Sequence, residues 1–226
     1  MHIEKNVCES CLGILLNIPG KTKDTLGARK DLEEMKIRSE LHPVQKGNGR
    51  QELPTACCTL SKEEKTSLCE CLHSIKVPSG YSANIKRLVS MKDLKLVGMK
   101  SHDCHVMMTQ MLPVAIRGIL PERVRVAIIK LCSFFNTISQ KVLDPMNLDK
   151  LQNDISLTLC QLEMFFPPAF FDIMVHLMIH IVKQIQILGL VFLHQMYPFE
   201  RFMSVLKKYV HNKSHLEGCI IQGSGT

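Results

Sequence analysis

Residues 148–188 read LDKLQNDISLTLCQLEMFFPPAFFDIMVHLMIHIVKQIQIL, with apolar residues three or four positions apart on both sides of a proline pair. This spacing is typical of amphipathic helices, which place one apolar face on a core. Pro167 and Pro168 separate the two patterns because proline cannot continue a helix without losing a hydrogen bond. The stretch therefore predicts two helices, over residues 148–165 and 170–188.

The helical pattern continues on both sides of this stretch. Further helices are expected over residues 106–120, 122–142 and 197–211, separated by proline or glycine. Pro113 should kink or divide the first of them, and Gly189 should end the helix that precedes the last. We find no internal repeat and no low-complexity segment, so the fold class is mainly α, a multi-helix chain.

The first hundred residues are less regular. The patterns predict an amphipathic helix over 3–16, a charged helix over 23–40, a loop over 42–54 and a helix from Ser61 to about His73. Ser61 and Glu64 have the spacing of a capping box, in which each side chain bonds a backbone amide of the first helical turn. Residues 82–99 are ambiguous between a short strand and an extended connector.

Composition limits the class of protein. Hydrophobic residues make up 46% and charged residues 22% of the 226 positions, which is typical of a folded chain. No uncharged apolar stretch is long enough to span a membrane, and the N-terminus lacks a secretory pattern, so we expect no membrane partner. The ten cysteines then favour a reduced intracellular protein. A net charge of +7 permits a nucleic-acid partner without requiring one.

Four groups of residues carry metal-ligating types. They are His102-Asp103-Cys104-His105, the stripe Asp172/His176/His180 at i, i+4 and i+8, and the pairs Cys8/Cys11 and Cys69/Cys71. Adjacent residues cannot all point at one ion, and structural zinc sites combine spaced pairs. We favour Asp103 as a helix-start anion, the stripe as a contact with a neighbouring helix, and the cysteines as packing residues. The expected metal ligands are therefore none.

The last predicted helix combines an acid with several bases. Glu200 lies in its first turn, where the helix dipole favours an anion. Lys207, Lys208, Lys213 and Arg201 make a basic face that is a candidate for DNA phosphates. A solvated basic face, with Glu200 paired to a neighbouring base, explains the same residues. The sequence leaves both interpretations open.

Several long segments together resemble one family, in the same order. These are MHIEKNVCES (1–10), LGILLNIPGKTKDTLGARKDLEEM (12–35), GMKSHDCHVMMTQMLPVAIRGILP (98–121), LCQLEMFFPPAFFDIMVHLMIH (159–180) and MYPFERFMSVLKKYVHNKSHLEG (196–218). The chain resembles the transposase of plant CACTA-type (En/Spm) DNA transposons. The part over 100–218 resembles the helical domain of unknown function in the C-terminal half of those proteins.

The resemblance implies a DDE-type enzyme with an RNase H-like core, in which three acidic residues hold two divalent metals for strand cleavage and transfer. It also implies a large helical insertion between the second and third acidic residues, which fits the helical pattern. Glu200 is then the candidate third acidic residue, and His2 looks like the remnant of an Asp-x-x-His motif. Mg²⁺ or Mn²⁺ would belong only to an intact parental transposase, so we expect no bound cofactor.

The chain also departs from the family. The first two catalytic aspartates would precede Met1, the sheet core is largely missing, and the usual tryptophan before Met196-Tyr197 is absent. The expected divisions are 1–53, resembling the end of the transposase core; 54–99, a connecting helical or extended segment; 100–218, the helical domain; and 219–226, a tail.

Three hypotheses follow. The first is a transposon-derived fragment without catalytic activity of its own, nuclear, and associated with DNA or other transposase copies. The second is a co-opted host protein-interaction module that binds host proteins through apolar helical grooves. The third, weaker hypothesis is a metal-dependent nuclease that uses His102, Asp103, His105 and the Asp172/His176/His180 stripe. No small-molecule substrate is expected under any of them.

Overall fold

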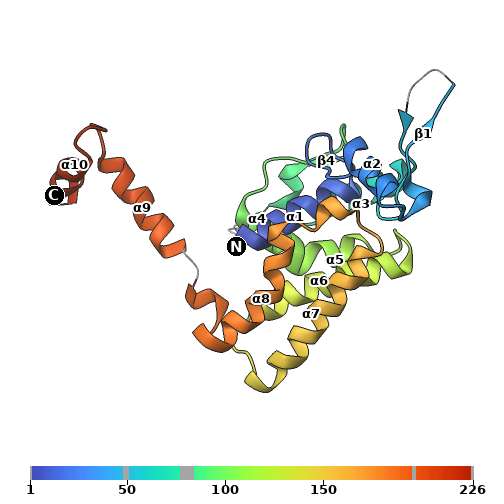
Figure 1. Ribbon diagram of the computed structural model, residues 1–226. Helices are drawn as coiled ribbons and strands as arrows, with labels where there is room; N and C mark the ends of the chain where they lie inside the picture. The colour runs from blue at the N-terminus through green and yellow to red at the C-terminus, as the bar shows by residue number, and fades with distance from the viewer. Residues whose placement is uncertain (1, 48–50, 77–83, 195–196, 225–226) are drawn as a thin grey trace.

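The computed structural model describes residues 2–47, 51–76, 84–194 and 197–224, and it confirms the mainly helical class. The α-helices are α1 His2–Leu15, α2 Leu26–Glu34, α3 Lys62–Ser74, α4 Ser101–Val106, α5 Leu112–Ala115, α6 Glu122–Ile138, α7 Leu148–Glu163, α8 Ile173–Leu188, α9 Tyr197–Tyr209 and α10 Leu216–Ser224. Elements α1 to α8 form a body, and α9 and α10 form an arm that leads away from it (Figure 1).

The two helices of the proline-separated stretch are confirmed, with shorter ends. Helix α8 begins at Ile173 because Asp172 caps it: the Asp172 carboxylate accepts from the amides of Met174 and Val175, at 2.9 and 3.1 Å. A 3₁₀ turn, Pro168–Phe170, precedes it and includes Phe170, the predicted first residue of the helix. Helices α6, α7 and α8 pack on one another in chain order.

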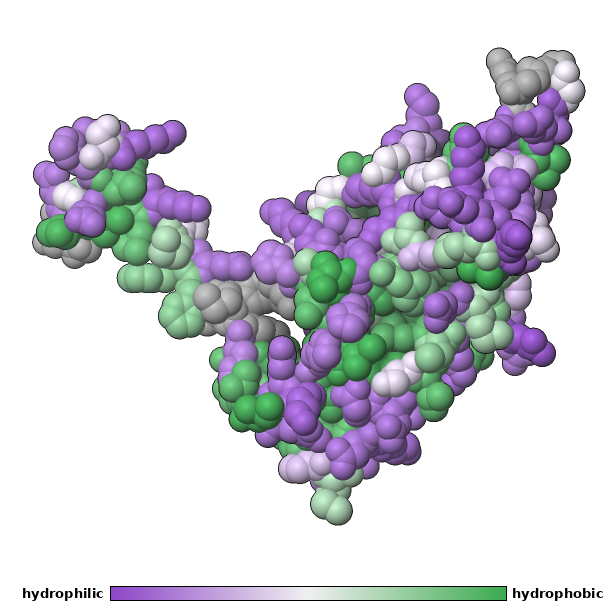
Figure 2. Space-filling view, in the orientation of Figure 1, coloured by the Kyte–Doolittle hydropathy of each residue, from purple (hydrophilic) through white to green (hydrophobic). Residues whose placement is uncertain are grey.

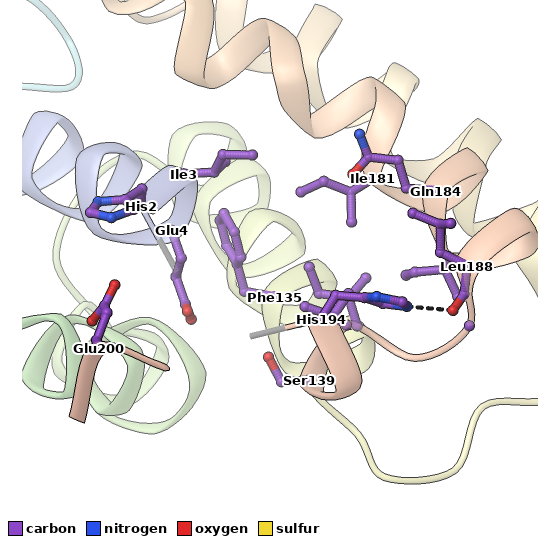
Figure 3. A pocket seen from close by; sticks show the side chains of 14 residues that line it. His2, Ile3, Glu4, Phe135, Ser139, Ile181, Gln184, Leu188, His194 and Glu200 are labelled. Carbon is purple, nitrogen blue, oxygen red and sulfur yellow. Dashed lines mark hydrogen bonds between the residues drawn. The ribbon is translucent and has the colours of Figure 1, made fainter. Parts of the chain in front are cut away.

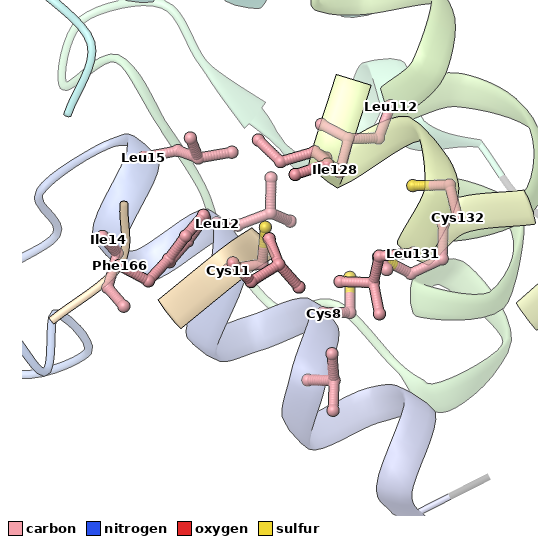
Figure 4. Packing of buried hydrophobic residues seen from close by; sticks show 14 of the residues in the cluster. Cys8, Cys11, Leu12, Ile14, Leu15, Leu112, Ile128, Leu131, Cys132 and Phe166 are labelled. Carbon is pink, nitrogen blue, oxygen red and sulfur yellow. The ribbon is translucent and has the colours of Figure 1, made fainter. Parts of the chain in front are cut away.

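Helix α1 lies at the centre of the core rather than on its surface (Figure 4). The sequence predicts an amphipathic helix here, yet α1 is buried on most of its circumference, because α4, α8 and a π-helical turn all pack against it. Its fully buried side chains include Cys8, Cys11, Leu12 and Leu15. The body therefore uses one helix near the N-terminus as the element around which later helices assemble.

Pro113 does not divide the predicted 106–120 helix: residues 101–115 are helical throughout, with a change of helix type before Pro113. Helix α4 is followed by a π-helical turn, Met107–Met111, and Pro113 then lies in the first turn of α5. Proline has no backbone N–H to donate, and its ring clashes with the preceding turn of an α-helix. The wider π-helical turn before Pro113 makes room for the ring.

The charged helix predicted over 23–40 is shorter than expected. Helix α2 ends at Glu34, and Lys36 and Arg38 adopt left-handed backbone conformations, with φ of 56° and 51°. From this position the Arg38 guanidinium donates to the carbonyl oxygens of Phe165 and Phe166, at 3.0 and 2.6 Å. These contacts fasten the segment after α2 to the C-terminal end of α7.

The capping box of α3 is confirmed, and the non-helical segments are small hairpins. Ser61 accepts from the amide of Glu64 at 3.2 Å, and the Glu64 carboxylate accepts from the amide of Ser61 at 2.8 Å. The predicted loop over 42–54 contains the antiparallel strands β1 Val44–Gln45 and β2 Gln51–Glu52. The ambiguous segment contains a 3₁₀ turn, Ile85–Leu88, and the antiparallel strands β3 Val89–Ser90 and β4 Lys95–Leu96, while 82–83 lie outside the described residues.

The hydrophobic core is continuous through the body. It joins residues of α1 to residues of α4, α6, α7 and α8, which belong to different predicted divisions of the chain. The division into 1–53, 54–99, 100–218 and 219–226 stays a prediction. Among the described helices, none is long and apolar enough to cross a membrane.

Candidate functional site

A pocket of about 250 Å³ forms where the N-terminal end of α1 meets the C-terminal ends of α6 and α8 and the start of α9 (Figure 3). Phe135 and Ile138 of α6, with Ile181, Ile185 and Leu188 of α8, give it an apolar wall. Its polar side chains are His2, Glu4, Ser139, Gln184, His194 and Glu200. An apolar wall with a few converging polar groups is the usual form of a binding site.

The two residues that the resemblance singles out, His2 and Glu200, line this same pocket. They come from opposite ends of the chain, and Figure 3 shows both on one side of the pocket with Glu4. Sequence spacing could not predict that His2 and Glu200 share a pocket, because this depends on how α8 and the start of α9 pack near α1. No experiment or comparison tests a catalytic role for either residue, so that role stays a prediction.

The pocket also holds residues that the sequence analysis missed, above all Glu4. Glu4 is 7% exposed, and its Oε1 lies 2.8 Å from Nδ1 of His105 on α4. The hydrogen bond to Glu4 raises the pKa of His105, against the opposing effect of burial. Nothing in the local sequence marks Glu4, because its partner comes 101 residues later. The side chain of His105 is half-buried.

We expect the Glu4–His105 pair to make stability depend on pH. Because folding raises the pKa of His105, the pair stabilises the fold fully below the unfolded value of about 6.5, and this stabilisation is lost as pH rises through the folded pKa. In urea unfolding experiments, the free energy of unfolding should decrease as the pH rises from 6 to 8.5. In His105→Gln this dependence on pH should be weaker. An equally steep decline in His105→Gln would contradict the assignment.

Side chains of the 102–105 cluster make separate structural contacts. Asp103 Oδ2 accepts from the amide of Lys100 at 2.8 Å in the first turn of α4, which confirms it as a helix-start anion. His105 contacts Glu4, and Cys104 is buried.

The Asp172/His176/His180 stripe, predicted to contact a neighbouring helix, is instead divided among separate contacts. Asp172 caps α8 and pairs with Lys23, while Nε2 of His176 lies 3.2 Å from Nε2 of His180 on the exposed face. Within the described ranges, no three His, Cys, Asp or Glu side chains are grouped so that they could hold a metal ion. The arrangement required by the nuclease hypothesis is therefore not formed by these residues.

The cysteine pairs pack as apolar residues, and all ten cysteines are free thiols. Cys8, Cys11 and Cys69 are fully buried, whereas Cys71 is half-buried at the edge of the core. Burial raises the pKa of Cys11 well above its ordinary value and that of Cys132 to about 12. These two thiols are therefore protonated near neutral pH, which suits packing rather than nucleophilic chemistry.

The predicted basic residues lie on the arm. Lys207 and Lys208 are exposed in the last turn of α9, and Lys213 is exposed in the turn between α9 and α10. Asn212 shapes this turn, since its side chain accepts from the amide of Ser214 at 3.0 Å. The side chain of Arg201 lies outside what the structure describes. The three lysines thus form a cationic end to the arm.

The two divalent metals implied by the resemblance do not fit the described residues. Two-metal catalysis needs several carboxylates held around both ions. Of the pocket's carboxylates, Glu4 is already bonded to His105, and the described residues around Glu200 supply no metal-holding group.

The family described as Domain of unknown function (DUF4218) matches residues 138–224. This stretch runs from the end of α6 through the arm. The family is found in plant transposase-like proteins, and the match does not specify the CACTA type. Neither a curated protein nor a solved structure matches the chain. The match includes Glu200 and the three lysines of the arm, whereas His2 and Glu4 lie outside it.

Proposed function

We propose that this chain derives from a CACTA-type transposase, that it associates with DNA through the arm, and that it carries out no phosphodiester chemistry alone. The observation that carries the proposal is the exposed cluster of Lys207, Lys208 and Lys213 within the DUF4218 match. DNA association would place the protein in the nucleus, where imaging of a tagged chain would test it.

Physical chemistry supports the arm as a phosphate contact. Lysine ammonium groups that neutralise phosphates release counterions from DNA, which gives affinity without sequence preference. Among the described residues, Lys207, Lys208 and Lys213 form no ion pair, whereas lysines of the body such as Lys23 and Lys46 have acidic partners. The chain's net charge of +7 adds a long-range attraction.

The expected lack of catalysis rests on the carboxylates. Glu200 shares the pocket with Glu4, but a two-metal clamp requires more oxygen ligands than this pair provides. The purified chain with Mg²⁺ or Mn²⁺ should leave DNA substrates with CACTA transposon ends intact. Metal-dependent nicking that is lost in Glu200→Gln would overturn this part of the proposal.

Binding to duplex DNA should weaken steeply with salt. Replacing Lys207, Lys208 and Lys213 by glutamine should lower the slope of log K against log salt by about 1 for each phosphate contact removed. Fluorescence anisotropy with a labelled duplex at several salt concentrations measures both affinity and slope.

A matched control replaces three exposed lysines of the body, Lys30, Lys62 and Lys92, by glutamine. This variant has the same net charge as the arm variant, so it separates a local contact from general attraction. Equal losses in both variants would remove the arm as the interface, and no salt-dependent binding of the unaltered chain would remove DNA association altogether.

A host protein-interaction module is the second candidate, and one observation favours it. The arm exposes large apolar side chains, among them Phe199 and Phe202, at 62% and 61%. Such a module would retain a host protein after DNA is digested away, whereas a DNA-associated chain would not.

A further inference from the structure

We propose that α9 is a self-association helix, which pairs antiparallel with α9 of a second copy of this chain. The first observation is an apolar stripe on α9. Phe199, Phe202, Met203 and Leu206 follow the spacing i, i+3, i+4 and i+7, so they share one helix face. The first three are 62%, 61% and 52% exposed.

The arm itself does not cover this stripe. Helix α10 packs on α9 near its C-terminal end, where Gly223 lies so close to Tyr209 that an added Cβ would come within 2.5 Å of the ring. The stripe extends toward the N-terminal end of α9, away from that contact. Figure 1 shows α9 leaving the body, and Figure 2 shows apolar side chains on the surface of the arm. A single exposed Phe is ordinary, but a contiguous apolar helix face marks an interaction site.

The charges beside the stripe indicate which occupant fits it. Glu200 lies in the first turn of α9, and Lys207 lies seven residues later. Seven residues are close to two full turns, so both side chains project from the same flank of the helix. The flank is therefore acidic at one end and basic at the other, and Glu200 forms no ion pair with any described residue.

The flank with Glu200 and Lys207 is complementary in charge to the same flank of a second copy when the two helices are antiparallel. A two-fold axis places the same flanks opposite each other with their ends exchanged, so Glu200 faces Lys207 of the second copy and the reverse. The apolar residues meet in nearly the same alignment: Phe199 lies opposite Leu206 and Phe202 opposite Met203 after a relative shift of about 3 Å along the helix axis, which the long lysine side chain spans. In a parallel pair the two charged flanks would lie on opposite sides of the interface, so Glu200 and Lys207 would not meet. In the antiparallel pair the two helix dipoles also point in opposite directions, so they attract each other.

The pairing has a consequence for the pocket. Because Glu200 lines the pocket with His2 and Glu4, an antiparallel second copy brings a lysine to its rim. Lys208 and Lys213 remain outside the paired flank. Self-association thus adds a positive charge beside the carboxylate of Glu200, and it leaves Lys208 and Lys213 of both copies exposed. It does not depend on the proposed DNA association, because it is measured without DNA.

Sedimentation velocity of the full chain, without DNA, tests the pairing. The chain should form dimers whose fraction rises with concentration up to about 100 µM. Phe202→Ser should weaken dimerisation at least tenfold, because it removes a large apolar side chain from the middle of the interface. Leu157→Ser on α7 is the matched control: Leu157 is 62% exposed but lies outside the arm, so its loss should leave the dimer unchanged.

Charge exchange tests the orientation without altering the apolar stripe. Glu200→Lys and Lys207→Glu should each weaken dimerisation about twofold to tenfold, and the double variant should recover it because both pairs are reversed. A chain that stays monomeric at about 100 µM, or a double variant that fails to recover, would overturn the proposal. Capture of a host protein by this face without self-association would also overturn it and would favour the interaction module.

Discussion

Replacing Arg29 by methionine should lower the free energy of unfolding by about 3–5 kcal/mol, because it leaves a buried carboxylate without its partner. The Arg29 side chain is 1% exposed, and that of Asp24 is 10% exposed. Nε and Nη2 of Arg29 donate to the two carboxylate oxygens of Asp24 at 2.5 and 2.6 Å, and Nη1 donates to the Leu41 carbonyl at 3.0 Å. Urea denaturation followed by circular dichroism measures the loss.

Lys30→Met provides the control for this prediction. Lys30 is the next residue of α2 and is exposed, so its replacement removes the same charge without uncovering a buried partner, and the change should stay within about 0.5 kcal/mol. In Arg29→Met with Asp24→Asn, the loss should be smaller than the sum of the two single losses. Equal effects of Arg29→Met and Lys30→Met would show that the buried pair contributes nothing specific.

Gly13→Ala should destabilise the body by about 1–3 kcal/mol through overpacking. A Cβ at Gly13 would lie 2.6 Å from the carbonyl oxygen and 3.0 Å from the carbonyl carbon of Lys21. Both are backbone atoms of a segment that is held over the end of α1 by two hydrogen bonds. The Ile18 amide donates to the Gly13 carbonyl oxygen at 2.9 Å, and the Lys21 amide donates to the Ile18 carbonyl oxygen at 3.0 Å. The segment cannot move aside without breaking these bonds. Thermal unfolding of the variant measures the loss.

The same substitution at Gly27 should have the opposite sign. Gly27 lies in the first turn of α2, and the nearest atom to an added Cβ is Oγ1 of Thr25 at 3.8 Å, an ordinary contact. Alanine there favours the helix and restricts the unfolded chain, so Gly27→Ala should stabilise by about 0.4–1 kcal/mol. A Gly13→Ala variant as stable as the unaltered chain would show that the close approach is relieved at no cost.

Features fixed by neighbouring residues could be predicted, and features made by distant residues could not. Ser61 and Glu64 form their capping box because both partners lie in one helical turn. Helix α10 was missed, since its sequence LEGCIIQGS contains two glycines and little periodicity. Its place depends on the Gly223–Tyr209 contact and on Cys219, which is 5% exposed against the turn before it.

The candidate site shows the same division. The basic residues of the arm and the first-turn position of Glu200 could be predicted, because both follow from the pattern of one helix. The Glu4–His105 pair and the placement of Glu200 in one pocket with His2 could not, because each joins residues from distant parts of the chain. The burial of Arg29 gave no local signal either, since its environment depends on Asp24 and Leu41.

The amino-acid sequence by itself determined the helical class, the approximate place of most helices and the basic end of the arm, because periodicity, capping residues and prolines act within a few residues. The tertiary structure alone decided that α1 is enclosed by later helices, that His2 and Glu200 share a pocket, and that the apolar face of α9 is left uncovered. The physical reason is that burial is a property of the assembled chain: a side chain becomes buried or paired only when segments far apart in sequence pack against it.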